Sequence, residues 1–468
     1  MGYRFYLTGI FVFGPLFIPI PAISQPSVLI KNVPHVAQKP DFCGEACTEM
    51  YLKKLGSSLT QDDVFDLSGI DPSLGRGCAT PELDSALRIL GFQIGQVWYT
   101  VPAWSAKQVR RQFNELYADL AKGIPSIVCM RTSNRPGATE HFRLVLGFDA
   151  SSKSIVYHEP ALKNGSYKKM RLATFLQLWP LHYDSRQWTI IRLRLEPGHV
   201  IKSAGLAPHF SNADYCQAIL SLKENIPGHF TVLIEPPFVV IGNDDSANVA
   251  FFAARTVRWA VGNLKKVYFS KDPDHIISIW LFKDSASYER YTRAIFNIEP
   301  STPFGFYLPG SNALIMNIAT GGGTLVHEIV HPFMSSNFPA CPAWFNEGLG
   351  SLYEQSSSRR DTIIGLANWR LAGLQSAIRE KAVPPLKTLM STTDNEFYIE
   401  DEGTNYAHAR YLCYYLQEQG LLIPFYHAFV ANAASDPTGF GTLTKLLGKT
   451  TVREFRSKWE TFVLGLEF

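Results

Sequence analysis

The sequence is poor in charge and has no long basic or acidic run. Charged residues make up 18% of the 468 positions, and 44 Lys and Arg against 41 Asp and Glu leave a net charge of +3. Nucleic-acid-binding surfaces depend on concentrated positive charge, so this balance gives no support for a nucleic-acid partner. Hydrophobic residues reach 46%, which predicts globular folding rather than disorder. A chain of this length is expected to form two or three domains.

Long apolar runs are missing after the N-terminus, so we expect no membrane span in the mature chain. At the N-terminus, Arg4 precedes an apolar run, Phe5–Ile20, and Ala22–Ser24 has the small residues of a cleavage site. This pattern predicts a signal peptide over residues 1–24 and a secreted or periplasmic protein. The alternative is an uncleaved anchor, which the three prolines of this segment disfavour because they make a poor spanning helix.

Cysteine is scarce and odd in number. The seven cysteines are Cys43, Cys47, Cys78, Cys129, Cys216, Cys341 and Cys413. An exported protein with an odd count keeps at least one free thiol. One functional thiol and up to three disulfides satisfy the count, and the spacing does not determine the pairing.

The first half of the chain changes from helical to strand-like patterns. After a short strand-like run at 27–30, helical spacing appears at 41–52, 80–90 and 106–122, and strand-like runs follow at 125–130, 141–149, 154–160 and 188–193. Helices that precede an antiparallel sheet predict an α+β domain over residues 27–195. Residues 196–225, rich in proline and glycine at their start, are expected to form a linker and a helix.

The second half alternates strands and helices before it becomes mostly helical. Strands are predicted at 230–234, 238–241, 276–282 and 312–317, and helices at 211–224, 247–263 and 285–296. We expect one domain over residues 226–468, a mixed sheet followed by helices. Glycines 321–323 interrupt this pattern, and Thr324 is a candidate cap of the next helix.

That next helix carries His327-Glu328-Ile329-Val330-His331. Histidines four residues apart lie one above the other on a helix, so both can bind one metal ion. Glu328 can then take a proton from a water at the metal and hand it to the leaving amine. With Glu347 downstream as a third ligand, the pattern predicts a catalytic zinc site with one Zn²⁺ per chain. The alternative is a buried helix whose histidines are only hydrogen-bonded.

This order of elements and motifs resembles the gluzincin branch of zinc metallopeptidases over residues 230–465. The likeness is closest to bacterial domains with a tryptophan before Asn-Glu-Gly, here Trp344–Gly348. The resemblance implies that Asn312–Asn317 is the strand that lines the cleft and pairs with an extended peptide. It also implies that Tyr406 stabilises the oxyanion, with His408 as the second choice; the alternative is that Tyr406 is an ordinary core or surface aromatic residue.

One departure from thermolysin-like relatives concerns the residue that orients a zinc-binding histidine. Those relatives carry an acid near the position of Ser351, which is not acidic. Glu354 is the candidate to replace it; otherwise the site is weaker. Asn346 is a further candidate for a contact behind the ligands.

A second constellation lies in the first half. Gln38, Cys43 and Gly44 start a predicted helix after an extended stretch, and a thiol at a helix N-terminus is expected to favour the thiolate. His141 begins a strand, and Glu159 ends the next one. Together these residues can form a nucleophile, a base and an orienting acid.

These motifs resemble the papain-like cysteine peptidases that trim double-glycine leaders from bacteriocins, over residues 28–195. By this resemblance Gln38 supplies an oxyanion-hole amide, Cys43 attacks, His141 acts as base and Glu159 orients it. Family members usually have Asp where this chain has Glu159, and Asp149 is the other nearby acid. The alternative is a binding module in which Cys43 is in a disulfide with Cys47 or Cys78. A Cys47–Cys78 bond would instead leave Cys43 free.

The leading hypothesis is therefore an exported α+β protein with two peptidase domains. A papain-like cysteine peptidase domain would precede a zincin-like zinc metallopeptidase domain, and peptides or proteins would be the substrates. In one alternative the N-terminal domain only binds or presents the substrate. In another the chain is a non-catalytic peptide-binding protein.

Overall fold

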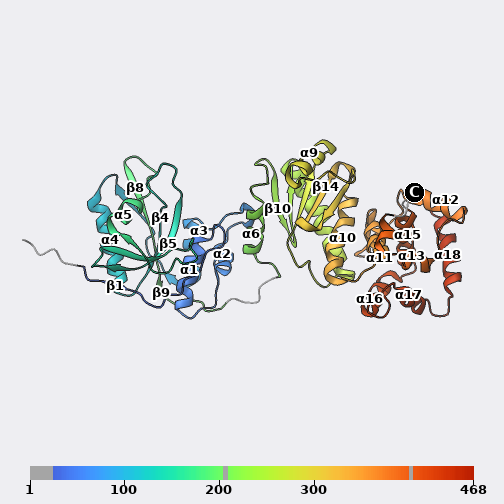
Figure 1. The fold of residues 1–468 in the computed structure, drawn as a ribbon, viewed down its shortest axis with the longest axis horizontal. Helices are drawn as coiled ribbons and strands as arrows, with labels where there is room; N and C mark the ends of the chain where they lie inside the picture. The colour runs from blue at the N-terminus through green and yellow to red at the C-terminus, as the bar shows by residue number, and fades with distance from the viewer. Residues whose placement is uncertain (1–24, 204–208, 400–403) are drawn as a thin grey trace, which may run out of the picture. The chain divides into compact units, whose positions relative to one another are not determined.

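The computed structural model describes residues 25–203, 209–399 and 404–468 (Figure 1). The predicted signal peptide, residues 1–24, lies outside the described residues. The chain forms two compact units. The first consists of residues up to Ser68 and Cys78–Ser203, and the second of Gly69–Gly77 and Ala204–Phe468. Among the described residues, no helix combines the length and the apolar character that a membrane span needs.

The first unit is built on a seven-stranded antiparallel sheet. Its strand order is β3-β8-β4-β5-β6-β7, and β1 pairs with β5. The strands are β1 (Val28–Leu29), β3 (Trp98–Pro102), β4 (Ser126–Arg131), β5 (Glu140–Asp149), β6 (Ser154–His158), β7 (Lys168–Arg171) and β8 (Gln187–Arg194). A short pair, β2 (Phe92–Gln93) and β9 (Glu196–Pro197), lies outside this sheet. The predicted α+β class is thus confirmed for this unit.

Helices cover the central strands of this sheet. They are α1 (Cys43–Lys54), α2 (Gln61–Ser68), α3 (Thr80–Ile89), α4 (Ala106–Ala121) and α5 (Leu172–Leu178). Phe113 of α4 and Phe175 of α5 pack with Val128 and Met130 of β4 in one core cluster, and α1 packs near the start of β5. The helix predicted at 80–90 is confirmed as α3, and its N-cap is Ala79.

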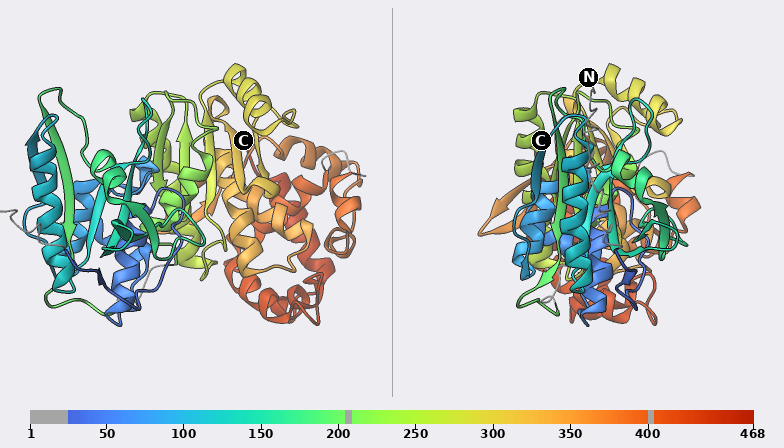
Figure 2. Two further views of the ribbon diagram at one scale, coloured as in Figure 1. Left: turned by 60° about the vertical axis from the view of Figure 1, so that its left-hand side comes forward. Right: turned by 90° about the vertical axis from the view of Figure 1, so that its left-hand side faces the viewer.

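The second unit contains a five-stranded mixed sheet in the order β10-β11-β12-β14-β13. Strands β11, β12 and β14 are parallel, and the two outer strands are antiparallel to their neighbours. The strands are β10 (Thr231–Glu235), β11 (Phe238–Gly242), β12 (Ile277–Phe282), β13 (Gly305–Leu308) and β14 (Ala313–Asn317). One face packs on α6 and α9, and the other packs on α8 and α10 (Figures 1 and 2).

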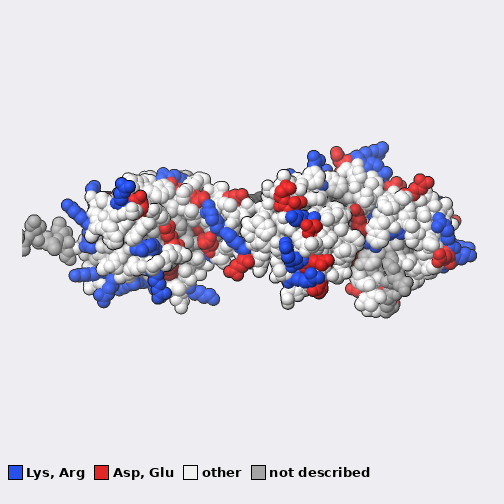
Figure 3. Space-filling model, turned by 90° about the horizontal axis from the view of Figure 1, so that it is seen from above, with Lys and Arg blue, Asp and Glu red and all other residues white. Residues whose placement is uncertain are grey.

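Helices make up most of the remainder of this unit. They are α6 (Asn212–Leu222), α7 (Ser246–Phe252), α8 (Trp259–Val267), α9 (Ser285–Phe296), α10 (Gly323–Asn337), α11 (Ala343–Leu352), α12 (Leu371–Arg379), α13 (Leu386–Met390), α14 (Asp394–Tyr398), α15 (Thr404–Glu418), α16 (Leu422–Asn432), α17 (Phe440–Leu447) and α18 (Val452–Leu464). A hairpin of β15 (Ser356–Arg359) and β16 (Thr362–Gly365) separates α11 from α12. On the face seen in Figure 3, Lys and Arg side chains are interspersed with acidic and uncharged ones.

Two predictions for this unit were wrong in detail. The strand expected to line the cleft, β14, has neighbours on both sides, and the outer strand of the described sheet is β13. Helix α10 begins at Gly323 with Gly322 as its N-cap, so Thr324 lies inside the helix. Neither error moves the motif itself, because all of it lies on α10.

The excursion Gly69–Gly77 connects two elements of the first unit but packs with the second. Its turn, Pro72–Leu74, contacts α6. Gly75 has φ of 53°, and a Cβ there would lie 2.8 Å from Ile219 Cγ2, so the close approach requires glycine. The sequence patterns contain no signal for this arrangement.

Candidate active sites

Helices α10 and α11 bring the three predicted metal ligands together. One ligand atom from each of His327, His331 and Glu347 lies within 4.8 Å of the others. His327 Nε2 is 3.1 Å from Glu347 Oε2, and His331 Nε2 is 3.8 Å from Glu347 Oε1. His327 and Glu347 are buried. Two imidazoles and one carboxylate are the donor set of many catalytic zinc sites, so these residues fit that ion.

The outer nitrogen of each histidine has its own partner. His327 Nδ1 is 3.1 Å from Glu354 Oε1, and His331 Nδ1 is 3.0 Å from Asn346 Oδ1. Both contacts agree with the candidates named from the sequence. They leave the two Nε2 atoms directed at Glu347, which is the orientation that metal-binding histidines need.

The charges of this site compensate one another. Burial alone would raise the pKa of Glu347 and Glu354, but hydrogen bonds from His327 outweigh it, and the pKa of each carboxyl is about 2. Burial likewise opposes protonation of His327, yet its two carboxylate partners raise its pKa. The cluster therefore holds ionised carboxylates in a buried place, as a cation site requires.

Glu328 lies on the same helix and faces the outer strand of the sheet. Burial raises the pKa of its carboxyl, His327 and His331 lower it, and a backbone hydrogen bond from Tyr307 of β13 lowers it further. Its carboxylate is 3.9 Å from His331 Nε2. Glu328 is therefore next to the ligand cluster without being one of the three converging residues.

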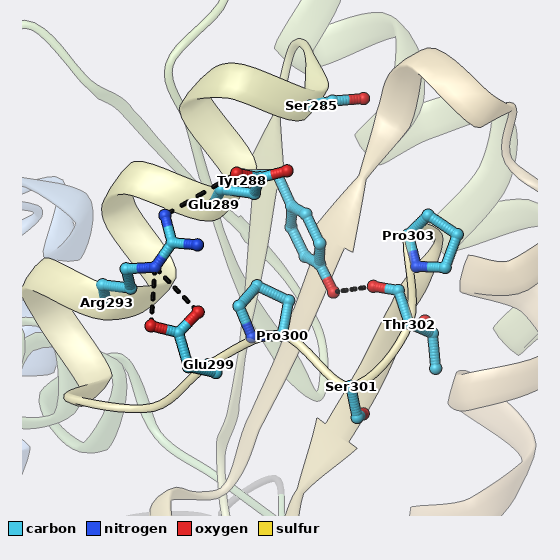
Figure 4. Close-up of a pocket in the computed structure, with 9 residues that line it drawn as sticks. All are labelled: Ser285, Tyr288, Glu289, Arg293, Glu299, Pro300, Ser301, Thr302 and Pro303. Atoms are coloured by element: carbon cyan, nitrogen blue, oxygen red, sulfur yellow. Dashed lines mark hydrogen bonds and ion pairs between the residues drawn. The ribbon is translucent and has the colours of Figure 1, made fainter.

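A pocket of about 350 Å³ lies between α9 and the loop that leads into β13 (Figure 4). Tyr288 donates a hydrogen bond to the Thr302 carbonyl oxygen over 2.9 Å, and Arg293 pairs with Glu299. Burial raises the pKa of Tyr288 to about 12, and the charge of Glu328 contributes to the rise. The pocket thus adjoins the elements that hold Glu328.

Two residues of α15 differ in their relation to this site. Tyr406 lies near the ligand cluster. Its pKa is raised by burial and then by the charges of Glu347, Glu328 and Glu354. His408 does not lie near this cluster: it is completely buried against Trp459, and burial lowers its pKa to about 3. The second choice for oxyanion stabilisation was therefore wrong.

Tyr398 was missed by the sequence analysis. It ends α14, and its hydroxyl donates a hydrogen bond to Glu347 Oε1 over 2.9 Å. Its ring also packs near that of Tyr406, with 6.3 Å between centroids. No spacing rule relates it to the histidines, since it belongs to another helix about fifty residues from Glu347.

In the first unit, Cys43 is the first residue of α1, as predicted. Burial raises the pKa of its thiol to about 11, although the backbone N–H of Phe142 lowers it in part. The negative charges of Glu45 and Asp41 raise it further. The expected stabilisation of the thiolate by the helix N-terminus is therefore outweighed.

The predicted base and acid do meet. His141 Nε2 is 2.5 Å from Glu159 Oε1, and Arg143 donates a hydrogen bond to Glu159 Oε2 over 2.7 Å. Burial raises the pKa of Glu159, but the bond to His141 and the charge of Arg143 lower it overall. The extra methylene of Glu159 therefore does not prevent its contact with His141. The other candidate acid, Asp149, instead bonds Lys169 and two serines.

Gln38 lies beside the residue that follows Glu159, since the Gln38 backbone N–H donates to the Pro160 carbonyl oxygen over 2.9 Å. Its side-chain Oε1 is buried without a hydrogen-bond partner among the described residues. The backbone N–H of Phe142, the residue after His141, lowers the pKa of the Cys43 thiol. The thiol therefore lies beside the start of β5. Nucleophile, base, acid and amide thus come from neighbouring segments.

All seven cysteines lie in the described part of the chain, and all are free thiols. The disulfides considered for Cys43 and Cys47 are therefore not formed. Cys78 is held by its backbone instead, since its N–H donates to Glu45 Oε1 over 2.7 Å.

Comparison with known proteins supports this reading of the first unit. Residues 30–185 match the model of the Peptidase_C39 like family. This region is cysteine-peptidase-like. The match covers most of the predicted domain 27–195 and none of the second sheet. It supports a peptidase and a peptide or protein substrate.

The other comparisons add no argument. A search of curated proteins finds no match. A solved structure described as "Structure of EndoMS-dsDNA2 complex" shares 12% identity and covers 43% of this chain and 95% of its own, with a TM-score of 0.10. A TM-score that low supports neither a shared fold nor a nucleic-acid partner.

Proposed function

We propose that this chain is an exported peptidase that hydrolyses peptide bonds at a gluzincin-like zinc site in its C-terminal half and carries a cysteine-peptidase-like domain in its N-terminal half. The observation that carries the proposal is the convergence of His327, His331 and Glu347 within 4.8 Å. Glu354 and Asn346 on the outer nitrogens add support, since a merely structural pair of histidines has no need of both. Export rests on the N-terminal sequence pattern alone.

Each of these residues has a separate role in the proposed hydrolysis of a peptide bond. A zinc ion held by the three ligands would polarise the scissile carbonyl and lower the pKa of water near neutrality. Glu328, 3.9 Å from His331 Nε2, accepts the proton of the attacking water and returns it to the leaving amine. Tyr406 donates a hydrogen bond to the oxyanion.

The outer strand β13 is the docking edge for the substrate in this proposal. It has one neighbour in the described sheet, and its Tyr307 amide already contacts Glu328. An extended peptide that pairs with β13 would pass the proposed base. This role replaces the one first assigned to residues 312–317.

The test is metal content and peptidase activity of the purified full chain. We expect about one zinc per chain, activity that a chelator abolishes, and loss of roughly 10³-fold or more in kcat in Glu328→Gln, since this removes the proton-transfer group. Cys43→Ala is the matched control, because it changes the other site only. Full chelator-sensitive activity in Glu328→Gln would contradict the mechanism.

A second activity, thiol-dependent hydrolysis, is favoured by the contact between His141 and Glu159 and by the family match. It predicts iodoacetamide-sensitive cleavage that Cys43→Ala abolishes and a chelator leaves intact. If only the chelator-sensitive activity is found, the N-terminal domain binds or presents the substrate. If neither activity nor zinc is found, the chain is a non-catalytic peptide-binding protein.

A further inference from the structure

Arg370 is a charged residue that the proposed chemistry does not use. It lies in the segment between β16 and α12, and its side chain is 18% exposed. Its guanidinium forks onto Glu354: Nη2 donates to Oε1 over 2.9 Å, and Nε donates to Oε2 over 3.4 Å. Glu354 Oε1 is also the atom that meets His327 Nδ1. A chain of contacts therefore runs from Arg370 through Glu354 to a metal ligand.

Two aromatic rings hold the same guanidinium. Its central carbon lies 4.2 Å from the centroid of Trp369 and 5.3 Å from that of Tyr406. Trp369 is 61% exposed, and a single exposed indole is not unusual at a protein surface. Here it covers a cation, and such contacts strengthen when water is excluded. Arg370 thereby also touches the residue proposed to stabilise the oxyanion.

Asn368 anchors this segment from the other side. It is 2% exposed, its amide donates to Glu354 Oε2 over 3.0 Å, and its Oδ1 accepts from the Arg370 N–H over 3.1 Å. Its backbone N–H donates to the hydroxyl of Tyr411 on α15 over 3.0 Å. The segment is thus tied to the helix that carries Tyr406.

We propose that Arg370 is a positioning residue of the zinc site, which holds Glu354 on His327 and holds the ring of Tyr406 beside it. This inference rests on the proposed function. Its physical basis is geometric: a planar guanidinium binds both carboxylate oxygens and stacks on rings at once, which an ammonium does not do. A carboxylate fixed at both oxygens keeps one rotamer, and a histidine that faces it keeps one ring orientation.

The test measures zinc affinity of the full chain by competition with a chromophoric chelator. Arg370→Met keeps the apolar stem and removes the fork, so we expect zinc to bind about 10- to 100-fold more weakly, as for other residues behind metal ligands. Arg370→Lys should recover only part of this loss. Arg359→Met removes an exposed arginine of the same unit that pairs with Glu418 and should leave the affinity unchanged.

Two further measurements separate positioning from folding. If Arg370 acts through Glu354, the affinity losses of Arg370→Met and Glu354→Gln should not add in the double variant. At saturating zinc, Arg370→Met should still lower kcat more than it changes KM, because Tyr406 has lost its neighbour. Thermal unfolding of each variant verifies that the fold is retained.

The outcomes distinguish this inference from the function on which it rests. Wild-type protein that binds no zinc would overturn the proposed function. Wild-type protein that binds zinc and loses affinity in Glu354→Gln, while Arg370→Met binds as tightly as wild type, would overturn only the role of Arg370. Additive losses in the double variant, or equal losses in Arg370→Met and Arg359→Met, would also overturn it.

Discussion

Burial raises the pKa of an acidic group at each of the two sites of this chain, but its effect prevails at only one of them. At the thiol site it prevails: the pKa of Cys43 rises to about 11, although the thiol begins a helix. At the histidine site it is overcome, and the hydrogen bond from His327 helps to lower the pKa of the buried Glu347 to about 2. The partner explains the difference. A helix N-terminus offers roughly half a charge, whereas a hydrogen-bonded imidazolium offers a full charge at contact distance.

The two sites differ in how closely the protonation states of their residues match the proposed reactions. The second unit already holds its carboxylates ionised and its imidazoles oriented, and a bound metal ion would displace the proton that the raised pKa of His327 favours. The first unit holds His141 and Glu159 together, but burial raises the pKa of the Cys43 thiol to about 11. In the proposed thiol-dependent reaction, a proton would have to move from Cys43 to His141 when a substrate is bound.

The largest expected effect is on the site with formed ligands. Glu347→Ala removes one of three ligand residues, so zinc content should fall from about one per chain to nearly none after dialysis. Elemental analysis of the purified protein measures it, with Cys43→Ala as the control that keeps its zinc. Zinc retained in Glu347→Ala would break the comparison, because the carboxylate would then not be a ligand.

The matching change in the first unit is Glu159→Gln. It removes the charge that faces His141, so thiol-dependent cleavage, measured with a chelator present, should fall about 10²-fold or more. Asp149→Asn is the control, since its carboxylate bonds Lys169 and not His141. Equal rates in wild type and Glu159→Gln would remove Glu159 from the triad.

A third prediction concerns Glu45, a buried acid near Cys43, and the pH dependence of the free energy of unfolding. Burial raises the pKa of Glu45 to about 7, whereas the unfolded chain loses this proton at about 4.5. The native state therefore binds more protons in that range, and its stability should fall as pH rises from about 4.5 to 7, by about 3 kcal/mol in total.

Glu45→Gln can still accept the bond from Cys78 but does not titrate, so its free energy of unfolding should lack this decline. Urea denaturation at pH 4.5 and pH 8 measures the difference between the two proteins. The same pH dependence in both would show that Glu45 does not carry the burial effect.

The smallest effect concerns the two tyrosines near the ligands. Tyr398→Phe removes the hydroxyl that bonds Glu347, so zinc affinity should fall about 3- to 10-fold, less than for a residue behind a histidine. Tyr406→Phe should keep zinc affinity and lower kcat. A reversal of these two results would exchange their roles.

Much of both sites could be predicted from local spacing. The histidines four residues apart, Glu347 on the next helix, and the strand that starts with His141 are patterns that local geometry enforces. Because Ser351 is not acidic, Glu354 is the next acid along the chain that could orient His327, and the structure confirms this contact.

The rest had no local signal. Tyr398 and Arg370 reach the site from elements remote in sequence. Strand β13 has only four residues and no clear strand pattern, so the expected peptide-pairing strand was residues 312–317.

The sequence by itself determined the residue types and the helix on which two ligands share one face, because the 3.6-residue period acts over a single turn. Only the tertiary structure decided which distant groups surround them and how far each is buried. Those two factors set the pKa of every reactive group described above, since solvation and neighbouring charge depend on contacts between segments far apart in the chain.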